Sequence, residues 1–148
     1  MKHLAIFLMT ILISATSCSD NDYVEVEGTW KVLTSKIIGC PDENKSDEVV
    51  IEYSNKACAE FGEADCFYKE ITFEGGNYFY SNASFENGST NMSSGFGSYT
   101  TDGQNITICE IDKCVEYVLF CEDGVLIMAS EKSDSFDGCR EHLYLKKM

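Results

Sequence analysis

The sequence predicts an all-β domain, an antiparallel up-and-down meander of about eight strands that closes into a barrel. Three observations predict it. Segments rich in β-branched and aromatic residues recur along the chain, short turns with glycine or aspartate separate them, and the only proline, Pro41, lies outside every segment. Because about eight strands suffice to close a small barrel, such a sheet has no exposed edges.

The first predicted strand begins just after Gly28, and Trp30, Val32 and Thr34 share one of its faces by period-two alternation. The second and third strands flank residues 74–77, whose two glycines can adopt the positive φ of a hairpin turn. The predicted strands are residues 29–37, 66–73, 78–85, 96–101, 104–111, 115–121, 125–130 and 140–146.

Turn residues justify the remaining strands. Asp102-Gly103 joins the fourth and fifth strands and is the pair favoured in type I′ turns, which makes it the strongest hairpin signal in the chain. Residues 122–124 separate the sixth strand from the seventh, and a polar loop, residues 131–138, precedes the last strand.

Two stretches interrupt this rhythm. Residues 46–60 mix apolar side chains with charges at a spacing that suits a short helix about as well as an extra strand, and we expect a short helix that covers one barrel end. Residues 87–94 are rich in Asn, Ser and Gly, and they predict a long connection or a ragged strand.

Charge and residue inventory exclude several functions. The formal net charge is −14, and no basic cluster apart from Lys146 and Lys147 interrupts it, so we expect no nucleic-acid partner. Only His142 follows the N-terminal segment, and a single histidine in a strand is more typical of a surface residue than of a general base. We predict no catalytic residues, no metal site and no cofactor. Asp134 and Asp137 share a loop but lack a calcium-binding register.

Cysteine usage indicates an oxidising compartment. The chain has eight cysteines, and C-x2-C zinc pairs are absent. Cys109 and Cys114 bracket a short turn and are the first candidate disulfide, and Cys58 with Cys66 is the second. A third pair would come from the remaining cysteines of the domain, with one thiol left over, and the sequence does not choose among Cys40, Cys121 and Cys139.

The N-terminal segment resembles a bacterial lipoprotein signal. A short basic start precedes an apolar stretch, residues 4–13, and small residues lead to Cys18 in a pattern that resembles the lipobox of Bacteroidetes-type bacteria. The apolar stretch is too short to span a bilayer core of about 30 Å. The resemblance implies removal of residues 1–17, lipidation of Cys18 including palmitate, an acidic tether over residues 18–25 and an outer-membrane lipoprotein of the cell envelope.

The domain over residues 26–148 resembles lipocalins and bacterial lipocalin-like lipoproteins. Gly28-Thr29-Trp30 matches their opening G-x-W motif, and the likeness continues through residues 71–78, 97–108 and 143–147. The resemblance implies that Trp30 plugs the closed end of the barrel, with a cation such as Arg140 or Lys146 near its ring.

The same resemblance implies a binding role. We expect a monomeric, non-catalytic binding or interaction module whose partner is an envelope protein; the alternative is a carrier of a small apolar ligand in the barrel mouth. Bulky inward side chains would fill part of the interior, Phe120 among them. A second alternative is a small inhibitor or stress-associated lipoprotein. The residues expected to line the barrel are Trp30, Phe73, Tyr78, Tyr80, Phe96, Tyr99 and Tyr117.

Overall fold

The computed structural model describes residues 24–40, 48–53, 66–131 and 138–148. Within these ranges all regular structure is β. The strands are β1 (Gly28–Ile38), β2 (Glu48–Glu52), β3 (Cys66–Glu74), β4 (Asn77–Glu86), β5 (Ser89–Asp102), β6 (Asn105–Glu110), β7 (Lys113–Glu122), β8 (Val125–Ser130) and β9 (Arg140–Lys147).

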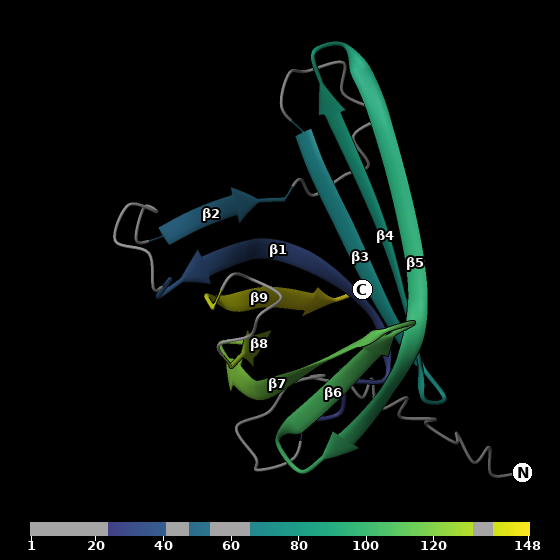
Figure 1. Cartoon of the computed structure of the whole chain (residues 1–148), viewed down its shortest axis with the longest axis vertical. Coiled ribbons are helices and arrows are strands. Elements are labelled where there is room, and N and C mark those ends of the chain that lie inside the picture. Colours follow the sequence, from purple (N-terminus) through teal and green to yellow (C-terminus); the bar gives the residue numbers. More distant parts are fainter. Residues whose placement is uncertain (1–23, 41–47, 54–65, 132–137) are drawn as a thin grey trace, which may run out of the picture.

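The strands form one antiparallel barrel (Figure 1). Each strand from β3 to β8 pairs with the next one along the chain, and β1 closes the cylinder because it pairs with both β3 and β9. The predicted up-and-down, lipocalin-like barrel is therefore confirmed, with β2 as one additional strand. In the described part of the chain, no helix is both long and apolar enough to cross a membrane.

The helix expected near residues 46–60 is wrong where the structure describes that range. Residues 48–52 form β2, which pairs with β1 from Thr34 opposite Glu52 to Ile38 opposite Glu48. The reason is tertiary: β1 pairs with β3 only over residues 28–31, so the rest of that edge has backbone groups that need partners. Strand pairing overrides the ambiguous local pattern. Residues 46, 47 and 54–60 lie outside the described residues.

The stretch expected as a connection or ragged strand, residues 87–94, is ordered as a hairpin. Asn87 and Gly88 form its two-residue turn with φ of 52° and 77°, and residues 89–94 begin the 14-residue strand β5. Pairing of β4 with β5 runs without a break from Glu86 opposite Ser89 to Asn77 opposite Ser98. Figure 1 shows β3, β4 and β5 extending together beyond the other strands.

The closed end of the barrel is packed around Trp30, as the sequence predicts. Its side chain is 0% exposed, and its Nε1–H donates to the carbonyl oxygen of Val26 at 2.6 Å. Val24 and Val26 are buried, so the segment before β1 covers this end. Glu27 extends that cover, because its carboxylate accepts hydrogen bonds from the Tyr99 hydroxyl and from the N–H of Gly75.

The cation over the indole is Lys147, and the expectation of Arg140 or Lys146 is wrong. The Lys147 Nζ lies 5.6 Å from the ring centroid of Trp30, its direct partner in the β1–β9 ladder. Side chains of directly opposed residues lie on the same face. Arg140 and Lys146 are separated from Lys147 by odd numbers of residues, and both are exposed on the outer face.

A β-bulge redirects the second half of β1. The register against β9 shifts between Val32 and Thr34, so Ser35, and not Thr34, continues the inward face that begins at Trp30. Ser35 is accordingly buried, whereas Thr34 donates its hydroxyl to Glu52 of β2 at 3.0 Å. The prediction that Thr34 shares the Trp30 face is wrong, because alternation counted from sequence does not register the extra residue.

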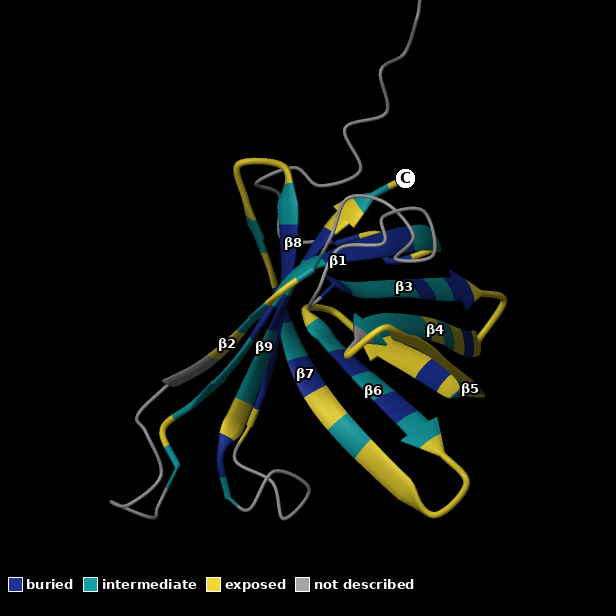
Figure 2. Cartoon of the chain, turned by 90° about the horizontal axis from the view of Figure 1, so that it is seen from above, coloured by how far each residue is buried: buried dark blue, intermediate teal, exposed yellow. Residues whose placement is uncertain are grey.

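Burial follows the strand alternation around the barrel. In Figure 2 buried bands recur along the strands, and longer exposed stretches cover parts of β5 and β7. The packed core includes the side chains Val32, Ile71, Phe73, Ile106, Leu119, Leu126, Met128 and Leu145.

Two disulfides fasten the end of the barrel opposite Trp30. Cys109 and Cys114 are bonded across the β6–β7 hairpin, as predicted. Cys40 and Cys139, 99 residues apart, join the residues that follow β1 and precede β9, which resolves part of the open choice for the third pair. Cys66 and Cys121 are also disulfide-bonded, and no free cysteine occurs in the described ranges. The predicted partner of Cys66, Cys58, lies outside them.

Candidate ligand-binding site

A cavity of about 300 Å³ opens at the end of the barrel opposite Trp30. Five strands line it, so it is a barrel mouth and not a crevice between neighbouring strands. A volume of this size is at the lower limit of small-molecule sites. The lining residues are Lys69, Ile71, Tyr78, Tyr80, Asn82, Ile108, Glu110, Lys113, Val115, Tyr117, Glu141 and Leu143.

Strand alternation explains this composition. Each lining strand contributes every second residue, for example Tyr78, Tyr80 and Asn82 from β4, because successive side chains alternate between inside and outside. The deeper positions are apolar: Ile71 and Leu143 belong to the buried core and form part of the cavity wall. The charged residues Glu110, Lys113 and Glu141 lie at or next to strand ends, and Lys69 lies within β3. The cavity therefore combines an apolar interior with a polar rim.

Tyrosine rings form one side of the cavity. The rings of Tyr78 and Tyr80 lie 5.9 Å apart between centroids, at a tilt of 44°. Tyr80 is directly opposite Gly95 in the β4–β5 ladder, and a Cβ at Gly95 would collide with the Tyr80 ring. The missing side chain therefore lets Tyr80 lie close against β5. Phe73 supports this side, 5.7 Å from Tyr78 between centroids.

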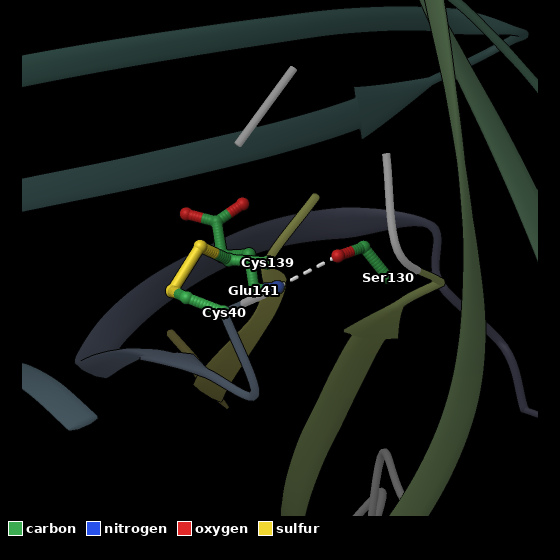
Figure 3. Close-up of a disulfide and its surroundings, with 4 residues drawn as sticks. All are labelled: Cys40, Ser130, Cys139 and Glu141. Carbon is green, nitrogen blue, oxygen red and sulfur yellow. Dashed lines mark hydrogen bonds between the residues drawn. A yellow bond between two sulfur atoms is a disulfide. The ribbon is translucent and has the colours of Figure 1, made fainter. Parts of the chain in front are cut away.

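Glu141 lines the cavity close to the Cys40–Cys139 disulfide (Figure 3). Its carboxylate accepts a hydrogen bond from the Tyr117 hydroxyl at 3.1 Å and another from the Ser35 hydroxyl at 3.4 Å. Its backbone N–H donates to Ser130 Oγ at 2.7 Å. Two residues before it, Cys139 carries the disulfide to Cys40. Residues from β1, β7 and β8 thus fix the position of one carboxylate.

The pKa values of the tyrosines in and near the cavity reflect their burial and their proximity to carboxylates. Burial raises the pKa of the Tyr117 phenol above its usual range, and the Glu141 carboxylate raises it further by charge and by hydrogen bonding. Burial also raises the pKa of Tyr78, followed by the charges of Glu110 and Glu141. The pKa of Tyr53, which follows β2, is also raised, mainly by burial and secondly by the charge of Glu141. These phenols are protonated at neutral pH and lie in the field of carboxylates.

The rim carries the remaining charges. Glu110 and Lys113 are exposed and directly opposed in the β6–β7 ladder, next to the Cys109–Cys114 disulfide. Lys69 lines both this cavity and an adjoining hollow of about 280 Å³, which runs along the β3–β5 extension. Asn82 is common to both as well, and its Oδ1 is buried without a hydrogen-bond partner among the described residues.

The structure places the seven residues predicted to line the barrel in three groups. Tyr78, Tyr80 and Tyr117 line the mouth cavity. The side chains of Trp30, Phe73 and Tyr99 belong to the packed core at the closed end, so they face inward but do not bound the cavity.

Phe96 is the exception, because it is 70% exposed on the outside of β5. Tyr99 faces inward and lies three residues away, and in a regular strand an odd separation puts two side chains on opposite faces. The same rule places Phe120, which is 46% exposed, opposite to the inward Tyr117. The inward assignments of Phe96 and Phe120 are therefore wrong.

Sequence reasoning missed the polar members of the site, Lys69, Asn82, Glu110 and Lys113, and above all Glu141. A signal for Glu141 is present in the sequence: it lies two residues before the inward Leu143, so alternation puts it on the same face. His142 is separated from the inward Leu143 by one residue position, so it lies on the opposite, outer face. Burial lowers the pKa of His142, and Arg140 and Lys36 lower it further.

Other predicted features fall elsewhere. In the described residues, no three acidic, histidine or cysteine side chains are grouped as a metal site requires. His142 lines a separate hollow on the outer face of β7–β9, away from the mouth cavity. The lipidation residue Cys18 and the loop residues Asp134 and Asp137 lie outside the described ranges.

The fold and the site together define an eight-stranded β-barrel protein with a small cavity in its mouth, apolar inside and polar at the rim. Compared with known proteins, the chain matches no family model, and no curated protein matches it.

Proposed function

We propose that this protein is a lipid-anchored, non-catalytic binding protein of the bacterial cell envelope that holds a small amphipathic molecule in its barrel mouth. The observation that carries the proposal is the mouth cavity of about 300 Å³, with an apolar interior and polar groups at the rim. Pockets of this composition bury the apolar part of a ligand and orient its polar part. The packed closed end leaves the mouth as the entrance.

Two further features support the envelope part of the proposal. The segment before residue 19 resembles a lipoprotein signal, in which Cys18 would carry the acyl chains and anchor the protein to the outer membrane. The disulfides are typical of an oxidising compartment outside the cytoplasm. Both are consistent with a barrel held close to a membrane.

Occupancy of the mouth is tested with two matched variants in β7. Val115 lines the cavity, whereas Val118, three residues on, lines the outer hollow. We expect the native protein, purified from membranes, to release a small amphipathic compound on organic extraction. Val115→Phe should lose that compound because the new ring occupies the cavity, and Val118→Phe should retain it. Equal recovery from both variants, or no compound from the native protein, would contradict the proposal.

A second candidate function is attachment to another envelope protein through the outside of β4 and β5. Phe79 and Phe96 are directly opposed there and are 46% and 70% exposed. Exposed aromatic pairs are typical of protein contacts. A photo-crosslinker at Phe96, compared with one at the exposed, outward Ser98, should capture one recurrent envelope protein. An equal scatter of neighbours from both positions would exclude this function.

A further inference from the structure

The Glu141 carboxylate makes no ion pair with the described residues. Its hydrogen bonds come from two neutral hydroxyls, those of Ser35 and Tyr117. The side chain is half-buried, and it lines the mouth cavity. Partial burial of a carboxylate costs free energy unless an opposite charge compensates it. The cavity thus presents a fixed negative group toward the space where a ligand would lie.

The groups around this carboxylate also favour a cation. The faces of aromatic rings carry negative potential, and Tyr78, Tyr80 and Tyr117 all line the same cavity. The carboxylates of Glu110 and Glu141 are the charged residues that act on the Tyr78 phenol. In addition, the buried Asn82 Oδ1 is a hydrogen-bond acceptor without a partner among the described residues. Each of these groups attracts a donor or a positive charge.

Two lysines in the lining act in the opposite direction. Lys113 is exposed and directly opposed to Glu110, so opposite charges face each other at that part of the rim. The Lys69 side chain makes no hydrogen bond or ion pair with the described residues, although its backbone pairs with Asn82. A lysine ammonium is strongly hydrated and sits on a flexible stem, so its field is screened more than that of a carboxylate fixed by two hydrogen bonds. The oriented group of the cavity is therefore Glu141.

We propose that the mouth cavity selects amphipathic ligands with a positively charged amine or ammonium group, which binds at Glu141 while the apolar part contacts Ile71, Ile108 and Leu143. This inference rests on the proposed binding function and specifies its ligand class. Tyr117 and Ser35 act as positioning residues because they hold the carboxylate. The Cys40–Cys139 disulfide restrains the strand end from which Glu141 projects.

Three probes with the same tail test the selectivity: hexyltrimethylammonium, hexanol and hexanoate. The full lipidated chain in lipid nanodiscs is titrated with each probe by calorimetry, and titrations of empty nanodiscs are subtracted. We expect the ammonium probe to bind at least about tenfold more tightly than the other two, as a charge-assisted contact would require. Tighter binding of hexanoate would reverse the proposal and assign selectivity to Lys69.

Variants connect the selectivity to Glu141. Glu141→Gln should weaken the ammonium probe about tenfold and leave hexanol unchanged. Glu116→Gln, on the exposed outer face of the neighbouring part of β7, is the matched control and should change nothing. Lys69→Gln should tighten ammonium binding about twofold. Unfolding midpoints establish that each variant is folded.

The outcomes separate this inference from the function on which it rests. If all three probes bind equally and Val115→Phe abolishes binding, the cavity binds ligands but the charge preference is wrong. If no probe binds the folded protein above the nanodisc background, the binding function itself is contradicted. If Glu141→Gln and Glu116→Gln weaken the ammonium probe equally, the effect is that of net charge, and the role of Glu141 is refuted.

Discussion

The Cys40–Cys139 disulfide should contribute more to stability than any local link in the barrel. It closes a loop of 99 residues, whereas Cys109–Cys114 closes one of only 5. In the chain-entropy account, a cross-link stabilises the fold by restricting the unfolded chain, and the effect grows with the logarithm of loop length. That relation gives about 4.7 kcal/mol for the long loop and about 2 kcal/mol for the short one.

The native contacts explain why the Cys40–Cys139 disulfide should have its full effect on the free energy of unfolding. β1 and β9 are already paired up to Ile38 opposite Arg140, so Cys40 and Cys139 lie just beyond the end of an existing ladder. The disulfide therefore adds little order to the folded state, and most of its effect belongs to the unfolded chain.

The assay is urea unfolding of two double variants, Cys40→Ala with Cys139→Ala and Cys109→Ala with Cys114→Ala. We expect the first to lose about 2.7 kcal/mol more free energy of unfolding than the second. Its m-value should also rise, because the unfolded chain without the long link exposes more surface. An equal or smaller loss for the Cys40–Cys139 pair, with an unchanged m-value, would refute the reasoning.

Three further predictions concern packing and pH. Gly97→Ala should lower the free energy of unfolding in urea by about 2 kcal/mol, because the new Cβ would collide with the backbone carbonyl of Cys109. Gly95→Ala should lower it less, because its new Cβ would collide with the Tyr80 side chain. The opposite order would contradict the close approach of the Gly97 backbone to Cys109. Phe73→Ala should lower the free energy of unfolding by about 3 to 5 kcal/mol, whereas Phe96→Ala should lower it by less than about 0.5 kcal/mol. Comparable losses would contradict the assignment of Phe73 to the inside and Phe96 to the outside of the barrel. The raised pKa values of Tyr78 and Tyr117 mean that the fold holds these protons more tightly than the unfolded chain, so their contribution is complete below the unfolded pKa of about 10 and declines as the pH rises above it. Unfolding free energy should therefore fall as the pH rises from about 10 to about 11.5, less steeply in Tyr117→Phe, and a flat profile over that range would contradict it.

Local signals predicted the parts of the fold that depend on neighbours in the sequence. Asp102-Gly103 marks a hairpin because its turn geometry requires those residue types, and Cys109 with Cys114 is bonded because a short turn brings the two residues opposite each other. The burial of Trp30 was predictable from its place in the first strand and from the resemblance to lipocalins.

Features that depend on distant residues were not predictable in the same way. The Cys40–Cys139 pair exists because barrel closure brings β1 beside β9, which no local spacing indicates. The bulge after Val32 changes the face of Thr34, and the open edge of β1 makes a strand of residues 48–52. Phe96 was assigned by its aromatic character, although alternation from Tyr99 places it outside. Glu141 was missed because a charged side chain is not expected inside a barrel, although alternation from Leu143 places it there.

The most direct test of the account is to locate a bound probe by nuclear Overhauser effects on methyl-labelled protein. With hexyltrimethylammonium added, the hexyl chain should show contacts to methyl groups of Ile71, Ile108, Val115 and Leu143, which line the mouth. Contacts confined to methyl groups on the outer face, such as those of Val118 or Ala129, would contradict the claim that the barrel mouth is the binding site.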